Sequence, residues 1–591
     1  MPRFADLLQH KMVLLLIAVC AGLFFASGHW QHQNVIRGDA QGYSAYLAAW
    51  VVHGQFDFTF YDNLSRDEKL RYWIDHREGL DPFPKLTMGL AYAQLPLFWI
   101  VHEVSAVMGW PQDGWSNPYH LSVGLTGLLV LLLGLLALDV WLRRRFSKLV
   151  SAATLLLLVG ATNLLYYSSF DNAHSHQYSF SLFAIALWSF DTWLIKRKCL
   201  HLWGAALFFG WVTLIRPTNA LFMLVPIIQL LGRREMWISA WNWKSILAVV
   251  AFLMPIIPQM VLWKLATGSW VFYSYGEEQI FWLSPHVMEG LFSFRNGWLV
   301  YTPLMFFAFI GLVFTKKIDS SLTLATTIVL PIHVYIVFSW WCWYYGSSLS
   351  IRPMIDLYPL LAFPLAGFIR WVISNKWWWS LGFTSLSLLL IVNNFFQTAQ
   401  YHRGQLHGSD MTSDAFRMLF FNPDPPSDLG IIGLYSIPDS ENLKRGLAER
   451  IKHDTIIEKE WSFSDLPEGL VVNHQHQFTR ALKAEAGQFE TTGDRIMEIS
   501  AQIRSENYVG QKVYLVVSFV DSALSYGYHT AELHKMRLET GRWQRVRCYL
   551  EEPKDLPQTG KLEAYLWFQE GEGEVELKDL RIRQIDCPYV D

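Results

Sequence analysis

Hydrophobic residues gather into long runs along the first two thirds of the chain. A helix needs about 17–25 mostly apolar residues to cross the hydrocarbon core of a bilayer. Runs of this kind, the fifth and sixth of them short, lie at Met12–Ser27, Tyr119–Leu142, Leu149–Tyr167, Tyr178–Ile195, His201–Ile215, Asn219–Leu231, Ser245–Leu265, Gly297–Thr315, Ser320–Trp340, Ile355–Ile373 and Trp378–Phe396. No comparable run follows Phe396. The pattern predicts a polytopic α-helical body, residues 1–400, with about 11 transmembrane helices.

The carboxy-terminal part has a different pattern. From about Asp454, apolar and polar residues alternate, as they do over residues 497–503, and turn residues separate the alternating stretches. Alternation with a period of two is typical of strands with one buried face. We therefore predict an all-β sandwich over residues 454–591. Residues 401–453 contain the apolar stretch 416–421 and then several prolines, which predicts an interfacial helix and a linker.

Basic residues predict which ends of the helices face the cytoplasm, because cytoplasmic loops carry an excess of Lys and Arg. The cationic turns are Arg143–Arg145, Lys196–Lys198, Arg233–Arg234, Lys316–Lys317 and the pair Arg370 and Lys376. All of them fall on one side if the apolar segment Leu86–Met108, which His102 and Glu103 interrupt, does not cross the membrane. We therefore expect this segment to be interfacial or re-entrant, the amino terminus to be inside, and the carboxy-terminal domain to be outside.

The first apolar run is compatible with a secretory signal as well as an anchor, since Ala26-Ser27-Gly28 is a weak cleavage site. We favour a retained anchor because the residues that follow carry candidate chemistry. The long outer loop over residues 28–118 then stays attached to the membrane body.

Composition supports a membrane protein and excludes several other classes. Charged residues make up 17% of the chain, against about 25% in an ordinary soluble protein, and the formal net charge is -3. A disordered chain, a coiled-coil rod, a small disulfide scaffold and a nucleic-acid-binding protein are all disfavoured.

Of the 5 Cys residues, Cys548 and Cys587 share the external domain, where a disulfide can form, but sequence does not show whether their geometry allows it.

Two outer segments carry acids and histidines. Asp39, about ten residues after the first run, suits a general base or, alternatively, a helix N-cap. The loop between the third and fourth runs holds Asp171, His174 and His176. These three residues could bind a metal or hydrogen-bond a substrate. We favour hydrogen bonding because the loop shows no strand pattern that would align both histidines.

Four cations also lie at outer ends of apolar segments: Lys85, Arg216, Arg295 and Arg352. Any one of them is compatible with an interface anchor whose charged end reaches water. Together, beside acids and aromatics, they indicate an anion site, and Arg suits phosphate oxygens in particular. A phosphate at a membrane surface implies a lipid-linked phosphate.

The outer segments also contain dense aromatic residues and a second acidic pair. The run Trp340-Trp341-Cys342-Trp343-Tyr344-Tyr345-Gly346 is too dense for an aromatic belt alone, and aromatic faces stack on sugar rings. Glu277 and Glu278 form the acidic pair, a second candidate for a base.

Taken in order, these motifs resemble the bacterial GT-C glycosyltransferases of the protein O-mannosyltransferase and aminoarabinose lipid A transferase type. The resemblance covers roughly residues 5–400. Its motifs are Arg37-Gly-Asp39-x-x-x-Tyr43, Lys85-x-x-x-Gly89, Asp171…His174-Ser-His176, Arg216-Pro-Thr218, and Trp343-Tyr-Tyr-Gly…Arg352-Pro. The family takes a sugar from a polyprenyl phosphate outside the cytoplasm.

The resemblance implies a role for each candidate residue. Asp39 would activate the acceptor, and Lys85, Arg295 and Arg352 would hold the donor phosphate and stabilise charge on the leaving group. Arg216 would join them or bind carbonyls, and Asp171 with His174 would orient acceptor or sugar. The substrate-binding set would include Tyr43, His174, His176, Glu277, Glu278, Trp343 and Tyr344.

The resemblance also implies the partners and the location. They are a polyprenyl-phosphate-linked sugar, a lipid, glycan or protein acceptor, and the bacterial inner membrane, with no nucleic acid. No cofactor is required, and no phosphate-binding nucleotide motif is present. A divalent metal stays open, although Ala40 stands where some relatives place a second acid. A transporter or flippase of a lipid-linked glycan, and a non-catalytic scaffold, are the alternatives; internal repeats that would favour a transporter are not found.

The end of the chain resembles a carbohydrate-binding jelly-roll module. The matching stretches are residues 541–546, 565–567 and 575–580. This domain would bind glycan or acceptor, or else serve only as a structural or docking domain.

Overall fold

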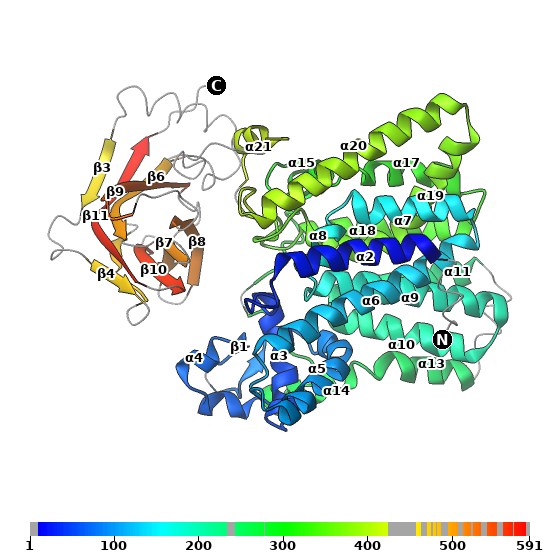
Figure 1. Cartoon of the computed structure of the whole chain (residues 1–591), viewed down its shortest axis with the longest axis horizontal. Coiled ribbons are helices and arrows are strands. Elements are labelled where there is room, and N and C mark those ends of the chain that lie inside the picture. The colour runs from blue at the N-terminus through cyan, green and yellow to red at the C-terminus, as the bar shows by residue number, and fades with distance from the viewer. Residues whose placement is uncertain are drawn as a thin grey trace. The chain divides into compact units, whose positions relative to one another are not determined.

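The computed structural model describes residues 10–77, 79–232, 243–276, 278–409 and 411–422, and then residues 457–462, 470–473, 477–479, 481–485, 495–505, 512–521, 524–533, 540–551, 560–570 and 573–586. The chain divides into two compact units, Met1–His402 and Arg403–Asp591. The first is helical and the second is built from strands (Figure 1).

Long apolar helices dominate the first unit, because a helix satisfies its own backbone polar groups where lipid offers none. The longer helices are α2 (Lys11–Ser27), α5 (Gly89–Met108), α6 (Asn117–Arg143), α7 (Lys148–Gly160), α9 (Ser175–Lys196), α10 (Cys199–Ile215), α13 (Trp243–Leu253), α14 (Ile257–Thr267), α17 (Met305–Thr315), α18 (Ser320–Phe338), α19 (Tyr358–Ser374) and α20 (Trp377–His402).

Short elements connect them. These are α3 (Asp39–Leu47), α4 (Arg66–Lys69), α8 (Leu164–Ser169), α11 (Leu224–Leu231), α15 (Val287–Phe292), α16 (Trp298–Tyr301), the π-helix η2 (Ala48–Val52), the 3₁₀ helices η3 (Thr59–Asn63), η4 (Pro217–Met223) and η5 (Arg352–Leu357), and the strands β1 (Ile74–Asp75) and β2 (Phe83–Pro84).

The helical body predicted from sequence is confirmed, but the count of 11 spans is not. Within the described residues, 6 helices are long and apolar enough to cross a membrane. The bent pair Ser245–Leu253 and Ile257–Thr267, with 45° between its parts, makes a seventh if it acts as one span. The remaining predicted runs form shorter helices: Lys11–Ser27, Lys148–Gly160, Cys199–Ile215, Pro217–Leu231 and Met305–Thr315.

Helix α5 is a candidate span, and the expectation that it is interfacial or re-entrant stays a prediction. It runs without a break for 20 residues and meets the length and composition needed for a span. Its polar residues do not interrupt it, because they lie on the helix and find partners: Nδ1 of His102 is 2.8 Å from the hydroxyl of Tyr119. Length and composition therefore allow α5 to cross the membrane.

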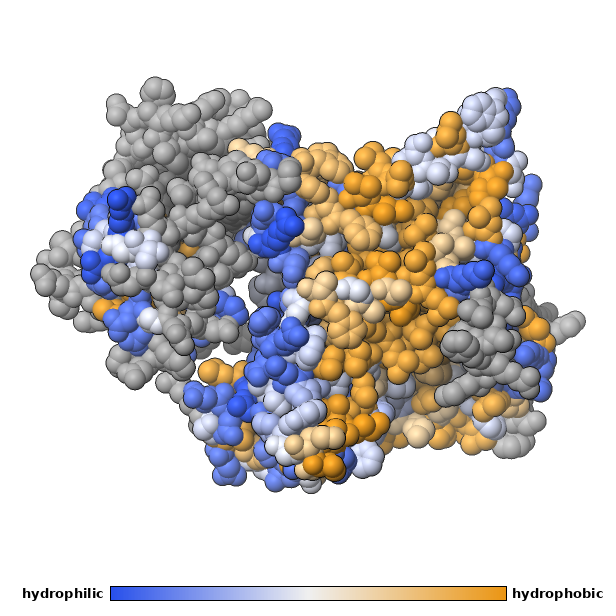
Figure 2. Space-filling view, viewed as in Figure 1, coloured by the Kyte–Doolittle hydropathy of each residue, from blue (hydrophilic) through white to orange (hydrophobic). Residues whose placement is uncertain are grey.

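The outer surface of the helical unit is broadly apolar. Figure 2 shows a continuous hydrophobic surface over α2, α6 and α20, with hydrophilic residues towards both ends of the helices. Large apolar side chains point outward there, including Leu129, Leu133, Leu388 and Val392. A surface of this extent is normal only where lipid or a partner covers it, so the unit is a multi-pass membrane domain.

Ion pairs hold the basic turn that follows α6. Asp139, which is 1% exposed, lies 2.7 Å from Nη2 of Arg143. Arg145 pairs with Asp191 of α9 and lies 3.2 Å from Asp319, whose side chain caps α18. These ion pairs join α6, α9 and α18.

The strands of the second unit form two antiparallel sheets. They are β3 (Ile457–Ser462), β4 (Leu470–Asn473), β5 (Leu482–Glu485), β6 (Arg495–Ser505), β7 (Lys512–Asp521), β8 (Leu524–Glu532), β9 (Gln544–Glu551), β10 (Lys561–Glu570) and β11 (Glu574–Asp586), preceded by the short helix α21 (Ser413–Leu419). One sheet has the order β5-β10-β7-β8 and the other β3-β11-β6-β9, with β4 also paired to β11.

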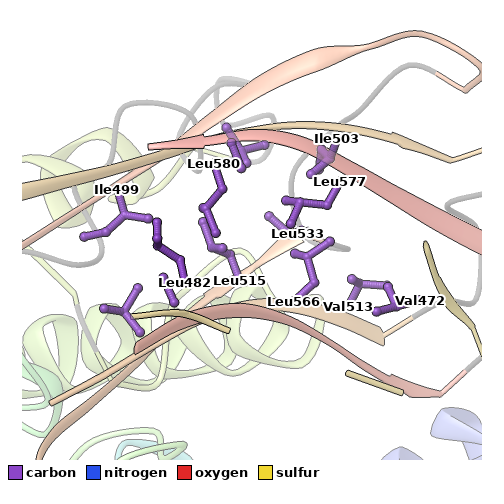
Figure 3. Packing of buried hydrophobic residues seen from close by; sticks show 14 of the residues in the cluster. Val472, Leu482, Ile499, Ile503, Val513, Leu515, Leu533, Leu566, Leu577 and Leu580 are labelled. Carbon is purple, nitrogen blue, oxygen red and sulfur yellow. The ribbon is translucent and has the colours of Figure 1, made fainter. Parts of the chain in front are cut away.

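Alternating residues of both sheets fill one apolar core, as the sequence pattern predicts. Figure 3 shows Ile499, Ile503 and Leu577 of one sheet facing Leu515 and Leu566 of the other. All five are fully buried. This packing makes the unit a β-sandwich. Cys587 lies outside the described residues, so its pairing with Cys548 stays a prediction.

Close helix packing in the first unit depends on glycine. A Cβ atom at Gly311 of α17 would lie 1.9 Å from the carbonyl oxygen of Pro364 in α19, whereas a Cβ at Gly382 of α20 would meet nothing within 4 Å. Small residues of this kind let helices approach each other in membranes.

We expect Gly311→Ala to destabilise the protein and Gly382→Ala to leave it unchanged or slightly more stable. Overpacking costs about 1–3 kcal/mol, whereas an unhindered alanine in a helix gains about 0.5–1 kcal/mol over glycine. The thermal midpoints of the two purified variants in the same detergent check this. Equal midpoints would contradict the packing described here.

Candidate active site

The candidate site lies where α9 and α19 begin and α10 ends, opposite the basic turns of the same helices. Asp39 is the first residue of α3, and Gly38 before it has a φ of 54°, which L side chains rarely adopt. The N-cap of α3 is Gly38 and not Asp39, so the N-cap alternative is not supported. Tyr43, one turn further along α3, is buried, and burial, followed by Tyr275 and Asp39, raises its pKa.

Asp39 lies between an arginine and a histidine. Its Oδ2 is 3.3 Å from Nη2 of Arg352 and 3.7 Å from Nδ1 of His174. Burial by itself would raise the pKa of the Asp39 carboxyl, but nearby positive groups bring it below its usual range; in order of effect they are Arg352, His174, Arg216 and Lys85. Asp39 is therefore a carboxylate at neutral pH, the form that accepts a proton.

The loop that leads into α9 supplies a second acid. Nε2 of His174 is 3.4 Å from Oδ2 of Asp171, so this histidine lies between two carboxylates. Nδ1 of His29 is 3.0 Å from the carbonyl oxygen of the residue before Asp171. Burial, and then the charge of Arg37, lowers the pKa of His29 to about 4. His29 is thus neutral at pH 7, and its Nδ1–H can hold this loop in place.

Lys85 is held on the other side of the site. It forms an ion pair with Glu278, and its Nζ is 5.0 Å from the ring centroid of Tyr275 and 5.2 Å from that of Trp73. Its side chain is only 14% exposed, so Lys85 is not an anchor that reaches out to water. Glu278, a candidate base by sequence, is here the counter-ion of Lys85. Glu277 lies outside the described residues.

A fully buried layer adjoins these groups. Nδ1 of His176 is 2.9 Å from Oδ1 of Asp356, and Nδ2 of Asn219 is 3.0 Å from Oδ2 of the same carboxylate. Nη1 of Arg216 is 3.3 Å from Nε2 of His176, and its Nε is 3.7 Å from Oδ2 of Asp356. Both ring nitrogens of His176 therefore have protein partners, and its proposed contact with a substrate stays a prediction.

The sequence analysis did not identify Asp356 as a candidate residue. Asp356 lies one helical turn after Arg352, at the start of the run predicted as Ile355–Ile373. An acid inside a predicted span is rare and is itself a signal of function. What sequence could not show is that His176, 180 positions away, is its partner.

The loop before Arg352 is strained. Tyr345, Ser347 and Ser350 have φ values of 47°, 54° and 59°, a region that costs non-glycine residues of order 1–3 kcal/mol each. The amide of Leu349 donates to the hydroxyl of Tyr167 at 3.1 Å, which helps to hold the loop. The Nε–H of Arg352 is buried and has no acceptor among the described residues.

Three predicted site residues form a separate group. The guanidinium carbon of Arg295 lies 3.5 Å from the ring centroid of Tyr344. Trp343 stacks on His286, with centroids 5.7 Å apart and 26° between the rings. None of the three contacts Asp39 in the part of the chain that the structure describes. The others, namely Asp39, Tyr43, Lys85, Asp171, His174, His176, Arg216, Glu278 and Arg352, come together.

The site offers acid–base and anion-binding chemistry. Within the described residues no group of three or more His, Cys, Asp or Glu side chains could hold a metal ion. Instead each acid faces a cation or a histidine, and the cations lie within the electrostatic reach of one carboxylate, Asp39. Such an arrangement can deprotonate one group while stabilising negative charge on another.

No protein-family model matches the sequence, and no curated protein matches it. Several solved structures, among them the following three, are similar to the chain. ArnT from Cupriavidus metallidurans, bound to undecaprenyl phosphate, is 15% identical with a TM-score of 0.38, covering 66% of this chain and 74% of its own. The arabinosyltransferase EmbB from Mycobacterium smegmatis is 11% identical with a TM-score of 0.38, covering 98% of this chain and 64% of its own.

The third structure is a xylanase. The endo-1,4-beta-D-xylanase 10B of Clostridium thermocellum, with its CBM22-1 and GH10 modules and bound xylohexaose, is 13% identical with a TM-score of 0.14, covering 24% of this chain and 29% of its own. The first two structures are GT-C membrane glycosyltransferases, the class that the sequence motifs resemble.

Proposed function

We propose that this protein is a membrane glycosyltransferase that moves a sugar from a polyprenyl-phosphate donor to a lipid, glycan or protein acceptor on the extracytoplasmic face. The observation that carries the proposal is the ionised Asp39, set among Arg352, Arg216 and Lys85 at one end of the membrane helices. One group can take a proton while its neighbours bind phosphate.

The proposed reaction is a direct displacement. The acceptor hydroxyl or amine attacks the anomeric carbon and gives its proton to Asp39, while the bond from that carbon to the phosphate oxygen breaks. The polyprenyl phosphate leaves with the bonding electron pair, and Arg352 and Lys85 stabilise its added charge. The unpaired Nε–H of Arg352 suits a phosphate oxygen, since a buried donor without an acceptor costs about 1–3 kcal/mol. Asp171, through His174, keeps Asp39 oriented.

The proposed side of the membrane rests on the basic turns. The basic turns Arg143–Arg145 and Lys196–Lys198 lie at the end of α6, at the end of α9 and at the start of α10. Asp171 and Arg216 lie at the opposite ends of α9 and α10. Helix α9 has 22 residues, which is long enough to separate its two ends by a bilayer. Because basic turns stay in the cytoplasm, the ends of α9 and α10 next to Asp171 and Arg216 face outward.

The test is donor consumption. The purified full-length protein is incubated with a panel of undecaprenyl-phosphate sugars and candidate acceptors, and mass spectrometry follows the loss of donor and the appearance of undecaprenyl phosphate. We expect Asp39→Asn to lower turnover by about 10²–10⁴-fold, the usual contribution of a general base. Asp67→Asn, an exposed acid in the same outer loop, is the matched control and should turn over normally.

Normal turnover by Asp39→Asn would remove the base assignment. Movement of an intact lipid-linked glycan between membrane leaflets, with no donor consumed by the wild type, would instead support a flippase.

We expect Arg352→Gln to shift the acidic limb of the pH profile of kcat/KM to higher pH. Arg352 is the strongest of the positive groups that keep the pKa of Asp39 low, so removing it raises that pKa. The base is then protonated, and inactive, at pH values where the wild type still works. Arg71→Gln, which removes an exposed arginine of the outer loop, should leave the limb in place; an unchanged limb in Arg352→Gln would contradict this role.

We also propose that the β unit binds glycan. From its two sheets, β5-β10-β7-β8 and β3-β11-β6-β9 with β4 paired to β11, we infer a jelly roll, an architecture found in lectin domains. On β10, Leu566 and Phe568 face the core, so Tyr565 and Trp567 face outward. Trp567 is stacked on Phe478 with centroids 6.0 Å apart. Aromatic faces beside polar neighbours suit sugar rings.

We expect Trp567→Ala to weaken binding of the full-length protein to an array of immobilised oligosaccharides by about tenfold, since an aromatic contact is worth up to about 1.5 kcal/mol. Trp543→Ala is the control, because Trp543 lies against Arg504 and Lys578 of the other sheet. Equal binding by both variants, or no binding by the wild type, would leave the β unit a structural domain.

A further inference from the structure

Arg216 is held from two sides by groups to which the reaction above gives no role. Asp356 lies 3.7 Å from its Nε and is 1% exposed. His176, which is fully buried, lies 3.3 Å from its Nη1. A buried guanidinium needs a counter-ion, because leaving a charge unpaired in a buried site costs several kcal/mol.

The direction of each hydrogen bond follows from Arg216, since a guanidinium only donates. Nε2 of His176 must therefore accept from Nη1, and the other ring nitrogen carries the proton. That proton is donated from Nδ1 to Oδ1 of Asp356 at 2.9 Å. Asn219 donates to the second carboxylate oxygen at 3.0 Å. Asp356 thus fixes the histidine ring, and the ring and the carboxylate together fix the guanidinium.

One end of the Arg216 guanidinium is not engaged by a partner. Its Nη2 has no acceptor among the described residues, and the side chain is 24% exposed. Its charge acts on Asp39, and it is the first group that opposes the effect of burial on Tyr275, whose pKa is raised to about 12. Two ends of the guanidinium are therefore engaged by buried partners, while its charge reaches Asp39 and Tyr275.

We propose that Asp356 and His176 are positioning residues that orient Arg216 to bind the phosphate of the polyprenyl donor. The inference rests on the proposed function and adds a residue pair to it. An arginine fixed in advance loses little side-chain entropy when it binds phosphate, and its planar fork can contact two oxygens.

The alternative is that the network only joins η4, η5 and α9. Asp319 offers a matched comparison, since it also pairs with a half-buried arginine and joins helices, but at the basic ends. Asp319→Asn should lower the stability of the protein without changing binding at the site. Asp356→Asn should lower both the stability and the binding.

The test measures the dissociation constant of undecaprenyl phosphate for the full-length protein in nanodiscs. We expect Arg216→Gln and Asp356→Asn each to weaken binding about tenfold or more, as loss of a charge-assisted hydrogen bond does. The double variant should be no weaker than Arg216→Gln alone, because residues that act through one another are not additive. With the donor that the wild type consumes, Asp356→Asn should raise the donor KM and leave the acceptor KM unchanged.

A second pair of variants decides the question if Asp356→Asn does not fold. In His176→Gln the side-chain oxygen can still accept from Arg216, whereas in His176→Asn the amide can donate only to Asp356. We expect His176→Asn to bind undecaprenyl phosphate more weakly than His176→Gln.

The outcomes separate the two proposals. If the wild type does not bind undecaprenyl phosphate, the proposed function fails and this inference fails with it. If the wild type binds but Arg216→Gln and Asp356→Asn bind equally well, or if their effects add in the double variant, only the positioning role is overturned.

Discussion

Pairing of charges inside an apolar helical body is the constraint on which this structure depends. A charge removed from water costs several kcal/mol unless a partner and hydrogen bonds compensate it. The chain meets this requirement at both ends of its helices. At the basic ends Arg145 joins Asp191 and Asp319, and at the opposite ends Arg216 and Arg352 join Asp356 and Asp39. The first set joins helices. In the second set Asp356 is buried, but Asp39, Arg216 and Arg352 are partly exposed and the two arginines keep donors available.

The charges at the basic ends hold helices together, whereas the charges at the opposite ends are placed for chemistry. Asp191 and Asp139 are almost fully buried by their arginines, whereas the Asp39 side chain is 24% exposed. An exposed carboxylate among cations can exchange partners when a substrate arrives, and its low pKa keeps it ionised meanwhile. The strained loop before Arg352 fits the same interpretation, because strain persists where surrounding contacts fix a functional geometry.

The sequence predicted the features that depend on neighbouring residues and missed the contacts between residues that are far apart in the chain. Each apolar run became helical, and alternation predicted the strands, because both depend on short-range periodicity. Asp39, Asp171 and Lys85 stood out because polar residues beside apolar runs are rare. The partnership of Asp39 with Arg352 spans 313 positions, and no pattern along the chain encodes it. Arg295 and Trp343 were predicted from the same kind of evidence, a cation or an aromatic residue in an outer loop. They lie instead in the group with Tyr344, because residue type does not specify which loops meet.

The paired charges also limit how a donor phosphate can enter the proposed site. Arg352 keeps an unpaired Nε–H, so it can donate to a phosphate oxygen without releasing Asp39. Lys85 is different, because its ammonium group already forms an ion pair with Glu278 and lies beside the rings of Tyr275 and Trp73. A phosphate near Lys85 would repel Glu278, since two anions cannot share one ammonium at no cost. Binding at Arg216 and Arg352 therefore comes first on electrostatic grounds, and engagement of Lys85 requires the segment that carries Glu278 to move away.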